Sequence, residues 1–248
     1  MAKIIVCFRG DLFVRAAILA GGYGKRLRPL TETLPKSLLP IGDKGIIEWQ
    51  IRWLRCYGIS ELVICAGYLK EKLVERLEDG SRYGVKIKYA FEENPLGTGG
   101  ALKNARKLLE DEDFFLLVNG DVLTDLNPLK LVDAMGKNFI AAIALVPLPS
   151  PYGVVRFDPE TWKITSFVEK PKIRDYWINA GVYAMKPEIF DYLPDEGNME
   201  RITLPALAER GLLRACPYEN CTWLSIDSHK DLEEASKIIP RLEIFKEY

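Results

Sequence analysis

Short apolar segments alternate with helical segments along the first half of the chain, and this alternation constrains the fold more than any other feature. Five segments are apolar enough to be strands buried on both faces. They are residues 14–19, 62–66, 85–91, 114–118 and 139–146. Helical patterns lie between them, over residues 45–57, 68–78, 98–110 and 125–137. Regular alternation of this kind predicts an α/β fold with a mostly parallel, Rossmann-like central sheet and helices on both faces.

The second half of the chain has a different pattern. Three strand-like segments, at 152–157, 163–168 and 178–185, are separated by turn residues such as Asp158 and Pro159. We expect an antiparallel excursion from the main sheet here, forming a small substrate lid or subdomain over about 148–220.

Two helices are expected to close the chain, one at 199–210 and one from Ser228 to about Phe245. Ser228 and Asp231 have the spacing of a capping box. No repeat or low-complexity linker divides the 248 residues, so the sequence predicts a single domain over 1–248, with residues 1–13 as an N-terminal extension.

Charge and hydropathy argue against several classes of partner. The chain has 34 Lys and Arg against 35 Asp and Glu, so no global basic field attracts nucleic acid or an anionic membrane. The longest apolar run has eight residues, whereas a membrane helix needs about 20. The five cysteines are odd in number and scattered, which is typical of reduced thiols in a cytoplasmic protein. We therefore expect no nucleic-acid or membrane partner, and leave a homo-oligomer open.

A glycine-rich loop follows the first apolar segment. Three glycines occur within four positions (Gly21, Gly22 and Gly24), and three cations follow directly at positions 25, 26 and 28. Glycine lets the backbone approach a ligand closely, so that successive N–H groups can point at phosphate oxygens. The dinucleotide-binding motif G-x-G-x-x-G is incomplete, because Leu27 stands in place of its third glycine. The Walker motif G-x-x-x-x-G-K-[ST] does not match either, because Arg26 stands in place of its Ser or Thr. A glycine turn with solvated charges is the remaining alternative.

Read together, residues 19–31 (LAGGYGKRLRPLT) and 35–40 (PKSLLP) closely resemble the sugar-1-phosphate nucleotidyltransferase family. Lys25 departs from the pattern, since many members carry Thr there. The resemblance implies nucleotidyl transfer from a nucleoside triphosphate to a sugar 1-phosphate, with pyrophosphate released. It implies catalytic roles for Arg26 and Lys36, and nucleotide binding by Leu19, Ala20, Gly21, Gly22, Gly24 and Lys25.

Further motifs extend the resemblance to the end of the chain. Residues 95–101 (PLGTGGA) resemble the base-recognition loop of the family, which implies nucleotide contacts by Gly97 and Thr98. Three segments resemble the sugar-phosphate side of the family site. They imply that sugar phosphate is bound by Gly153, Glu169, Lys170 and Asn179.

Two carboxylates are the candidate Mg²⁺ ligands. Asp121 follows the apolar segment 114–118, and the carboxyl end of a strand is where α/β sheets bind ligands. Asp227 lies where members of the family carry a second metal-binding carboxylate. Without the resemblance, Asp227 could instead be a residue that leads into the helix beginning at Ser228. Hard oxygen ligands suit Mg²⁺, which keeps waters and phosphate oxygens in its shell.

The expected reaction needs no general base, because the second pKa of a phosphate monoester is near 6 and the attacking oxygen is already mostly deprotonated at neutral pH. The only histidine, His229, is expected to be solvated. Residues 95–101 look most like the loop of family members that use mannose 1-phosphate and GTP. Transfer to glucose 1-phosphate from dTTP or UTP is the alternative that the resemblance allows. A non-catalytic NDP-sugar-binding regulatory subunit and a nicotinamide-dependent oxidoreductase are the other classes considered.

Overall fold

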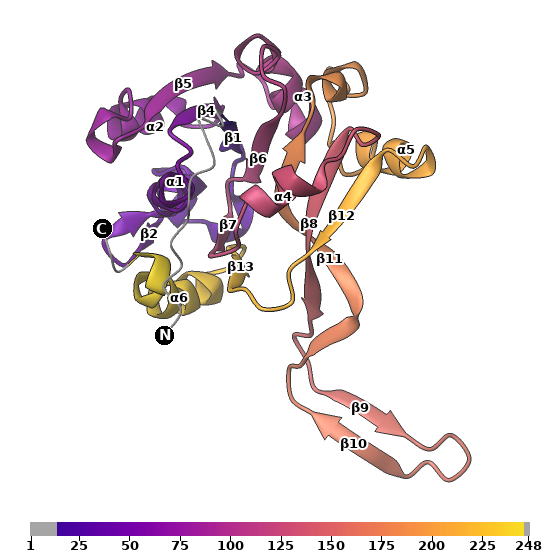
Figure 1. The fold of residues 1–248 in the computed structure, drawn as a ribbon. Coiled ribbons are helices and arrows are strands. Elements are labelled where there is room, and N and C mark those ends of the chain that lie inside the picture. Colours follow the sequence, from indigo (N-terminus) through magenta and orange to yellow (C-terminus); the bar gives the residue numbers. More distant parts are fainter. Residues whose placement is uncertain (1–13, 246–248) are drawn as a thin grey trace.

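The computed structural model describes residues 14–245, which form a seven-stranded sheet with helices on both faces (Figure 1). In spatial order the strands are β12 (Leu213–Pro217), β8 (Ala141–Pro149), β11 (Lys172–Met185), β6 (Phe115–Asn119), β1 (Arg15–Leu19), β4 (Glu61–Ala66) and β5 (Lys86–Phe91). Strand β11 runs antiparallel to both neighbours, and the other pairings in this sheet are parallel. The predicted fold class is confirmed.

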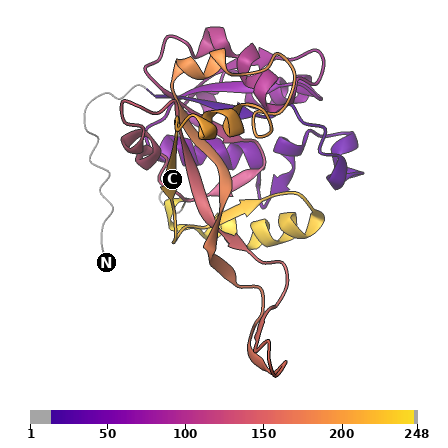
Figure 2. The same cartoon turned by 90° about the vertical axis from the view of Figure 1, so that its right-hand side faces the viewer.

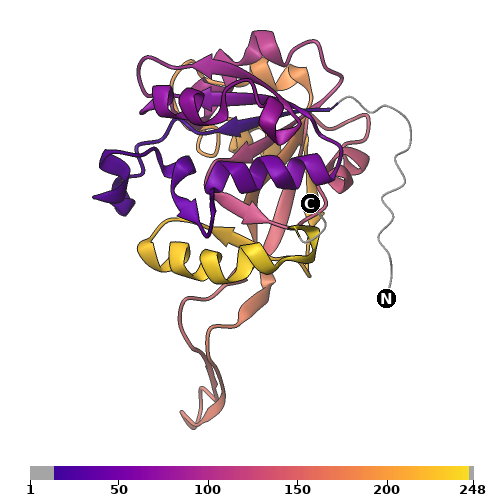
Figure 3. The same cartoon turned by 90° about the vertical axis from the view of Figure 1, so that its left-hand side faces the viewer.

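The two faces of the sheet bury separate hydrophobic clusters, because successive side chains in a strand point to opposite faces. In β1, Ala16 and Ile18 belong to one cluster and Ala17 to the other. The first cluster is covered by helices α1 (Ile46–Cys56), α2 (Lys70–Leu77), α4 (Leu129–Ala134) and α6 (His229–Ile238). The second is covered by α3 (Gly97–Asn104) and α5 (Thr203–Glu209). Figure 3 shows α1 in purple beside α6 in yellow, on the same side of the sheet.

Small elements complete the described part of the chain. Two-stranded sheets are formed by β2 (Pro40–Ile41) with β3 (Lys44–Gly45), β7 (Val122–Thr124) with β13 (Trp223–Ser225), and β9 (Val154–Phe157) with β10 (Ile164–Val168). The short 3-10 helices are η1 (Lys25–Leu27), η2 (Leu30–Glu32), η3 (Lys36–Leu38), η4 (Ser81–Tyr83), η5 (Arg106–Leu108), η6 (Pro187–Asp191), η7 (Ile239–Arg241) and η8 (Glu243–Phe245).

Several helices are shorter than the sequence pattern predicts. The closing helix was expected to reach about Phe245, but α6 ends at Ile238 because the ring of Pro240 prevents the helix from continuing. Its start is confirmed. The Ser228 hydroxyl accepts a hydrogen bond from the Asp231 N–H (3.3 Å), and the Asp231 carboxylate accepts one from the Ser228 N–H (2.7 Å). Likewise α4 covers only part of 125–137, since Asn127 and Pro128 form the turn before it.

The antiparallel excursion is a hairpin of β9 and β10 that projects from the sheet (Figures 1 and 2). The hairpin is the part of residues 148–220 that lies away from the body of the protein. The second half of β11 and the whole of β12 belong to the seven-stranded sheet instead. The predicted extension 1–13 lies outside the described residues. Within 14–245, no helix is long and apolar enough to cross a membrane.

Candidate functional site

A pocket of about 410 Å³ opens where β1 and β6 end side by side, at Leu19 and Asn119. Every nucleotide-binding and catalytic residue implied by the motifs lines it, together with both carboxylates. Its lining comprises residues 19–27, Lys36, Ser37, Glu92, Pro95, Gly97, Thr98, Ala101, residues 119–121, Asn198 and Asp227. The carboxyl ends of parallel strands are where α/β sheets bind ligands, so the sheet topology itself places these residues together.

The glycine loop is held close to its neighbours, and position 24 is the one at which its backbone conformation favours glycine. Gly24 adopts a positive φ of 59°, and a Cβ there would lie 2.9 Å from Cγ2 of Thr31. The Thr31 hydroxyl also donates to the Gly24 carbonyl at 2.9 Å. A Cβ on Gly21 would overlap the carboxylate of Glu92 at 1.7 Å. Gly22 faces open space, so a small residue is not required there for packing.

The turn between β6 and β7 carries Asp121 and is locked to the rest of the sheet. The Gly120 N–H donates to the Leu19 carbonyl at 3.0 Å, and a Cβ on Gly120 would approach that oxygen to 2.2 Å. From α1, the buried Gln50 amide donates to the carbonyls of Asn119 (2.9 Å) and Val122 (2.8 Å). Gln50 thus holds in place the turn that carries Asp121. The sequence patterns did not reveal this role, because a single glutamine in a helix belongs to no motif.

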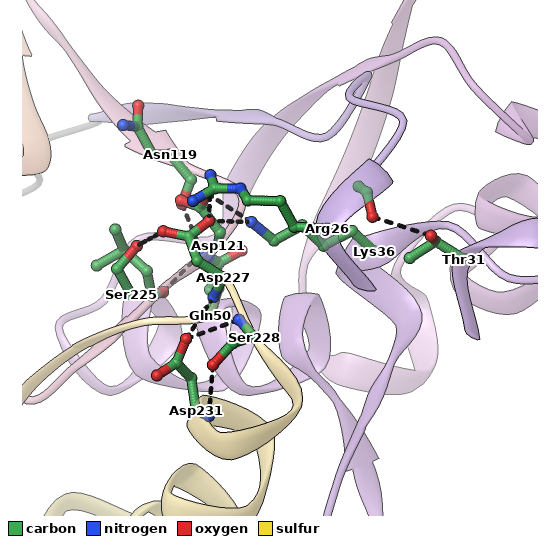
Figure 4. Close-up of polar contacts among 12 residues, drawn as sticks. Arg26, Thr31, Lys36, Gln50, Asn119, Asp121, Ser225, Asp227, Ser228 and Asp231 are labelled. Atoms are coloured by element: carbon green, nitrogen blue, oxygen red, sulfur yellow. Dashed lines mark hydrogen bonds and ion pairs between the residues drawn. The ribbon is translucent and has the colours of Figure 1, made fainter. Parts of the chain in front are cut away.

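Asp121 and Asp227 meet at the ammonium group of Lys36 (Figure 4). Lys36 Nζ lies 2.8 Å from Asp121 Oδ2 and 3.0 Å from Asp227 Oδ1. The two carboxylates flank a short antiparallel ladder: Asp121 precedes β7, Asp227 follows β13, and the Ile226 N–H donates to the Asp121 carbonyl at 2.9 Å. The three charged residues therefore form one cluster, although the sequence separates them by as many as 191 positions.

Asp227 is held by contacts on both of its carboxylate oxygens. Arg26 donates to Oδ1 at 2.8 Å, while the Ser225 hydroxyl donates to Oδ2 at 3.1 Å. Burial by itself raises the pKa of Asp227, but the charge and hydrogen bond of Lys36, with Ser225 and Arg26, outweigh it and lower the pKa below the usual range. The Arg26 side chain is 76% exposed, so its ion pair contributes little energy.

The predicted base loop forms the start of α3 and is docked against residues 194–200. A Cβ on Gly97 would lie 2.7 Å from the Gly197 backbone, and the Thr98 hydroxyl donates to the Glu200 carboxylate. Glu92 stands at the rim of this loop, where its Oε2 accepts from the Leu96 N–H at 2.9 Å. The sequence analysis missed Glu92, although its position directly after the strand predicted over 85–91 was a usable signal.

The predicted sugar-phosphate residues do not line the pocket. Glu169 and Lys170 are exposed beyond the end of β10, where their charged groups lie 3.7 Å apart. Gly153 lies at the base of the same hairpin, and a Cβ there would meet the Phe167 ring at 2.7 Å. The Asn179 amide donates to the Tyr183 hydroxyl at 2.6 Å. Their predicted roles therefore stay predictions.

Other predicted features can be placed directly. His229 is exposed at the start of α6 and is not part of the pocket lining, as expected for a solvated residue. Cys56, Cys65, Cys216 and Cys221 are free thiols, while Cys7 lies outside the described residues. Within 14–245, no group of three or more His, Cys, Asp or Glu side chains converges as a metal site.

Several known proteins are similar to this chain in sequence. The sequence profile of the nucleotidyl transferase family matches residues 15–241. Mannose-1-phosphate guanyltransferase of Yarrowia lipolytica is 37% identical over 225 residues, covering 88% of this chain and 62% of that protein. Mannose-1-phosphate guanylyltransferase catalytic subunit beta of Xenopus tropicalis is 35% identical with the same coverage. The chain thus spans about 62% of the length of these relatives.

A solved structure is similar to this chain in fold. The crystal structure of HddC from Yersinia pseudotuberculosis complexed with GMP-PN has a TM-score of 0.73 and 26% identity, covering 90% of this chain and 98% of that chain. The fold and pocket define an α/β protein whose glycine loop and cations lie at the carboxyl edge of its sheet, the edge where sheets of this kind bind ligands. The chain belongs to the nucleotidyl transferase family, and the resemblance to sugar-1-phosphate nucleotidyltransferases is confirmed.

The lowered pKa of Asp227 predicts how stability depends on pH. A carboxylate with a depressed folded pKa stabilises the protein fully above its unfolded pKa of about 3.9, and this contribution is lost as the pH falls through the folded value. We expect the free energy of unfolding of the wild type to fall more steeply between about pH 5 and pH 2 than that of Asp227→Asn. Urea denaturation measures this, with Asp133→Asn on α4 as an exposed control. Parallel curves for wild type and Asp227→Asn would contradict the electrostatic assignment.

Proposed function

We propose that this chain is a sugar-1-phosphate nucleotidyltransferase that joins an NTP to a sugar 1-phosphate and releases pyrophosphate. The observation that carries the proposal is the convergence of Arg26, Lys36 and two carboxylates at the mouth of a glycine-lined pocket. A silent regulatory subunit would be expected to lose one of Arg26, Lys36, Asp121 or Asp227, and all four are present. The free thiols in the described chain are in keeping with a cytoplasmic enzyme.

The pocket suits a reaction whose difficulty lies in bringing two anions together. The nucleophilic phosphate oxygen is already deprotonated at neutral pH, so the chemistry needs positioning and charge stabilisation. We assign the leaving pyrophosphate to Arg26 and the α-phosphate to Lys36. Both cations contact aspartates in this structure, so binding of the triphosphate exchanges carboxylate contacts for phosphate contacts.

Asp121 and Asp227 fit the requirements of a Mg²⁺ site. Their oxygens converge on a single positive charge, the Lys36 ammonium, and this contact supports a cation-binding position between them. Mg²⁺ is commonly held by one or two carboxylates, with waters and substrate phosphate oxygens completing its shell. When bound, it would offset the negative charge of the reacting phosphates.

The sugar 1-phosphate is assigned to Gly153, Glu169, Lys170 and Asn179. Lys170 would contact the nucleophilic phosphate, Glu169 and Asn179 the sugar hydroxyls, and Gly153 would permit close approach. All four lie on β11, or at the base of the hairpin that continues into it, and β11 pairs with β6 beside the pocket. The hairpin base must approach the pocket for this set to act.

Within this class we favour GTP and mannose 1-phosphate, with glucose 1-phosphate and dTTP or UTP as the alternative. Glu92 supports the guanine base: Oε2 is used by the Leu96 N–H, while Oε1 points toward Gly21 in the pocket. A carboxylate only accepts hydrogen bonds, and the pairing edge of guanine presents two adjacent N–H donors. Thymine and uracil present one N–H between two carbonyl oxygens, which a carboxylate repels. The names of the two curated relatives and the GMP-PN bound to HddC point the same way.

The first test is a pyrophosphate-release screen of NTPs against sugar 1-phosphates with Mg²⁺, using the wild type and Lys36→Ala. Loss of a preorganised charge contact typically lowers the rate by about 10²–10³-fold, and we expect that loss in turnover for Lys36→Ala. Lys88→Ala, on the exposed side of β5, is the matched control and should retain activity. Wild-type turnover by a folded Lys36→Ala protein would overturn the assignment.

A second test addresses base selection. We expect Glu92→Gln to lower kcat/KM for GTP by about tenfold or more, since a hydrogen bond to a charged group contributes about 1.5–3 kcal/mol. The isosteric amide keeps one oxygen for the Leu96 N–H, so the loop should remain folded. The ratio of kcat/KM for GTP over dTTP is the measurement, and an unchanged ratio would show that Glu92 does not read the base.

A further inference from the structure

Tyr68 connects the end of strand β4 to the glycine loop, residues 20–32. Its backbone N–H donates to the Gly21 carbonyl at 3.2 Å, and its hydroxyl donates to the Glu32 carbonyl at 3.3 Å. Its ring packs on the ring of Tyr23, with centroids 4.8 Å apart. One residue therefore contacts the loop near both of its ends and at an aromatic side chain between them.

The turn after β4 holds Tyr68 in this position. Leu69 adopts φ 53° and ψ 36°, a left-handed conformation that the side chain of a non-glycine residue disfavours. The Lys70 N–H closes the turn on the Gly67 carbonyl at 3.1 Å, and α2 begins directly afterwards. A backbone conformation of this kind persists only where the surrounding structure determines it strongly. The turn is thus a fixed support from which Tyr68 reaches the loop.

Tyr23 passes the contact on to a cation of the pocket. Its side chain lines the pocket and is 39% exposed. The Lys25 ammonium lies 5.7 Å from the centroid of the Tyr23 ring, within the range over which a cation is attracted to an aromatic face. Tyr68 itself does not line the pocket. It can act on a ligand there only through the loop that it holds.

The hydrogen bonds within the loop do not replace these contacts. The N–H groups of Leu27, Arg28 and Glu32 each donate to a carbonyl three residues earlier. Such turns shape the loop locally but do not attach it to the sheet. Burial of the Leu27 side chain anchors the loop at one point, and Tyr68 adds attachments at Gly21, Tyr23 and Glu32.

We propose that Tyr68 is a positioning residue for the nucleotide: through Tyr23 it holds the glycine loop and Lys25 in the conformation that receives the triphosphate. The inference rests on the proposed function for the identity of the ligand. When only a fraction of the protein has the binding-competent loop, the apparent affinity for the ligand falls by that fraction. Once bound, the phosphates themselves hold the loop, so the loss falls on KM for the nucleotide and not on kcat.

Steady-state kinetics test this division, with pyrophosphate release as the assay. Tyr68→Leu removes the ring and the hydroxyl, and we expect KM for GTP to rise about tenfold while kcat and KM for the sugar 1-phosphate change less than about twofold. Tyr68→Phe keeps the ring on Tyr23 and loses only the bond to Glu32, so it should restore most of the affinity. A fall in kcat with unchanged KM would overturn the proposal, because a merely structural role lowers the fraction of active enzyme.

Tyr89→Leu is the matched control. The Tyr89 hydroxyl also donates to a backbone carbonyl, that of Glu78 at 2.7 Å, and its ring stacks on Phe91 with centroids 5.6 Å apart. Tyr89 lies on β5 and does not line the pocket. We expect its kinetic constants to match those of the wild type. An equal rise in KM for GTP in Tyr89→Leu and Tyr68→Leu would show that any loss of a packed tyrosine has this effect.

A double-mutant cycle tests the route through Tyr23. Tyr68→Leu and Tyr23→Leu remove the same ring contact, so the rise in KM for GTP in the double variant should be smaller than the product of the two single effects. If the two effects multiply, Tyr68 does not act through Tyr23 and the proposal is wrong.

Hydrogen exchange of the ligand-free protein tests the loop contact without any turnover. The amides of Leu27, Arg28 and Glu32 report on opening of the loop, and they should exchange about tenfold faster in Tyr68→Leu than in the wild type or in Tyr89→Leu. Tyr23→Leu, which leaves β4 unchanged, should have the same effect and serves as the second variant if Tyr68→Leu melts at a lower temperature. Unchanged exchange in both variants would overturn the proposal. A protein that shows this exchange pattern but uses no NTP would instead contradict the proposed function alone.

Discussion

The meeting of two short strands, β7 and β13, is the constraint on which the site depends. Their ladder brings together segments about one hundred residues apart and leaves Asp121 at one side and Asp227 at the other. Two carboxylates so close would repel each other unless a cation lay between them, and Lys36 supplies that charge. The lowered pKa of Asp227 is the electrostatic signature of this arrangement.

The backbone around this cluster leaves little room for side chains. Gly120 lies against the Leu19 carbonyl, and Gly21 lies against the Glu92 carboxylate. These close approaches expose the main chain of the loop to the pocket, where N–H groups can face phosphate oxygens. Cationic side chains surround the same opening, while Gln50 fixes the turn from behind. The site thus combines a closely packed backbone with exposed charged groups such as Arg26, an arrangement that supports the proposal of a polyanionic substrate.

Much of this organisation could be predicted from the sequence because it is local. The apolar strands, the glycine loop and the capping box at Ser228 each have a periodicity or motif of their own, and the structure confirms them. The ladder of β7 and β13 could not be predicted, since three-residue strands show no alternation and their pairing is long-range. The end of α6 was misplaced although Pro240 signalled it, and Glu92 was missed although it directly follows the strand predicted over 85–91. The direction in which the hairpin projects has no sequence signature at all.

The central claim is that Asp121 and Asp227 act as one unit at the mouth of the pocket. A double-mutant cycle measures this directly, with kcat/KM for pyrophosphate release determined for Asp121→Asn, Asp227→Asn and the double variant. Residues that act as a unit are strongly non-additive, so the double variant should lose little more activity than the worse single variant. If the two losses multiply as independent effects, the carboxylates do not share a function and the account of the site is wrong.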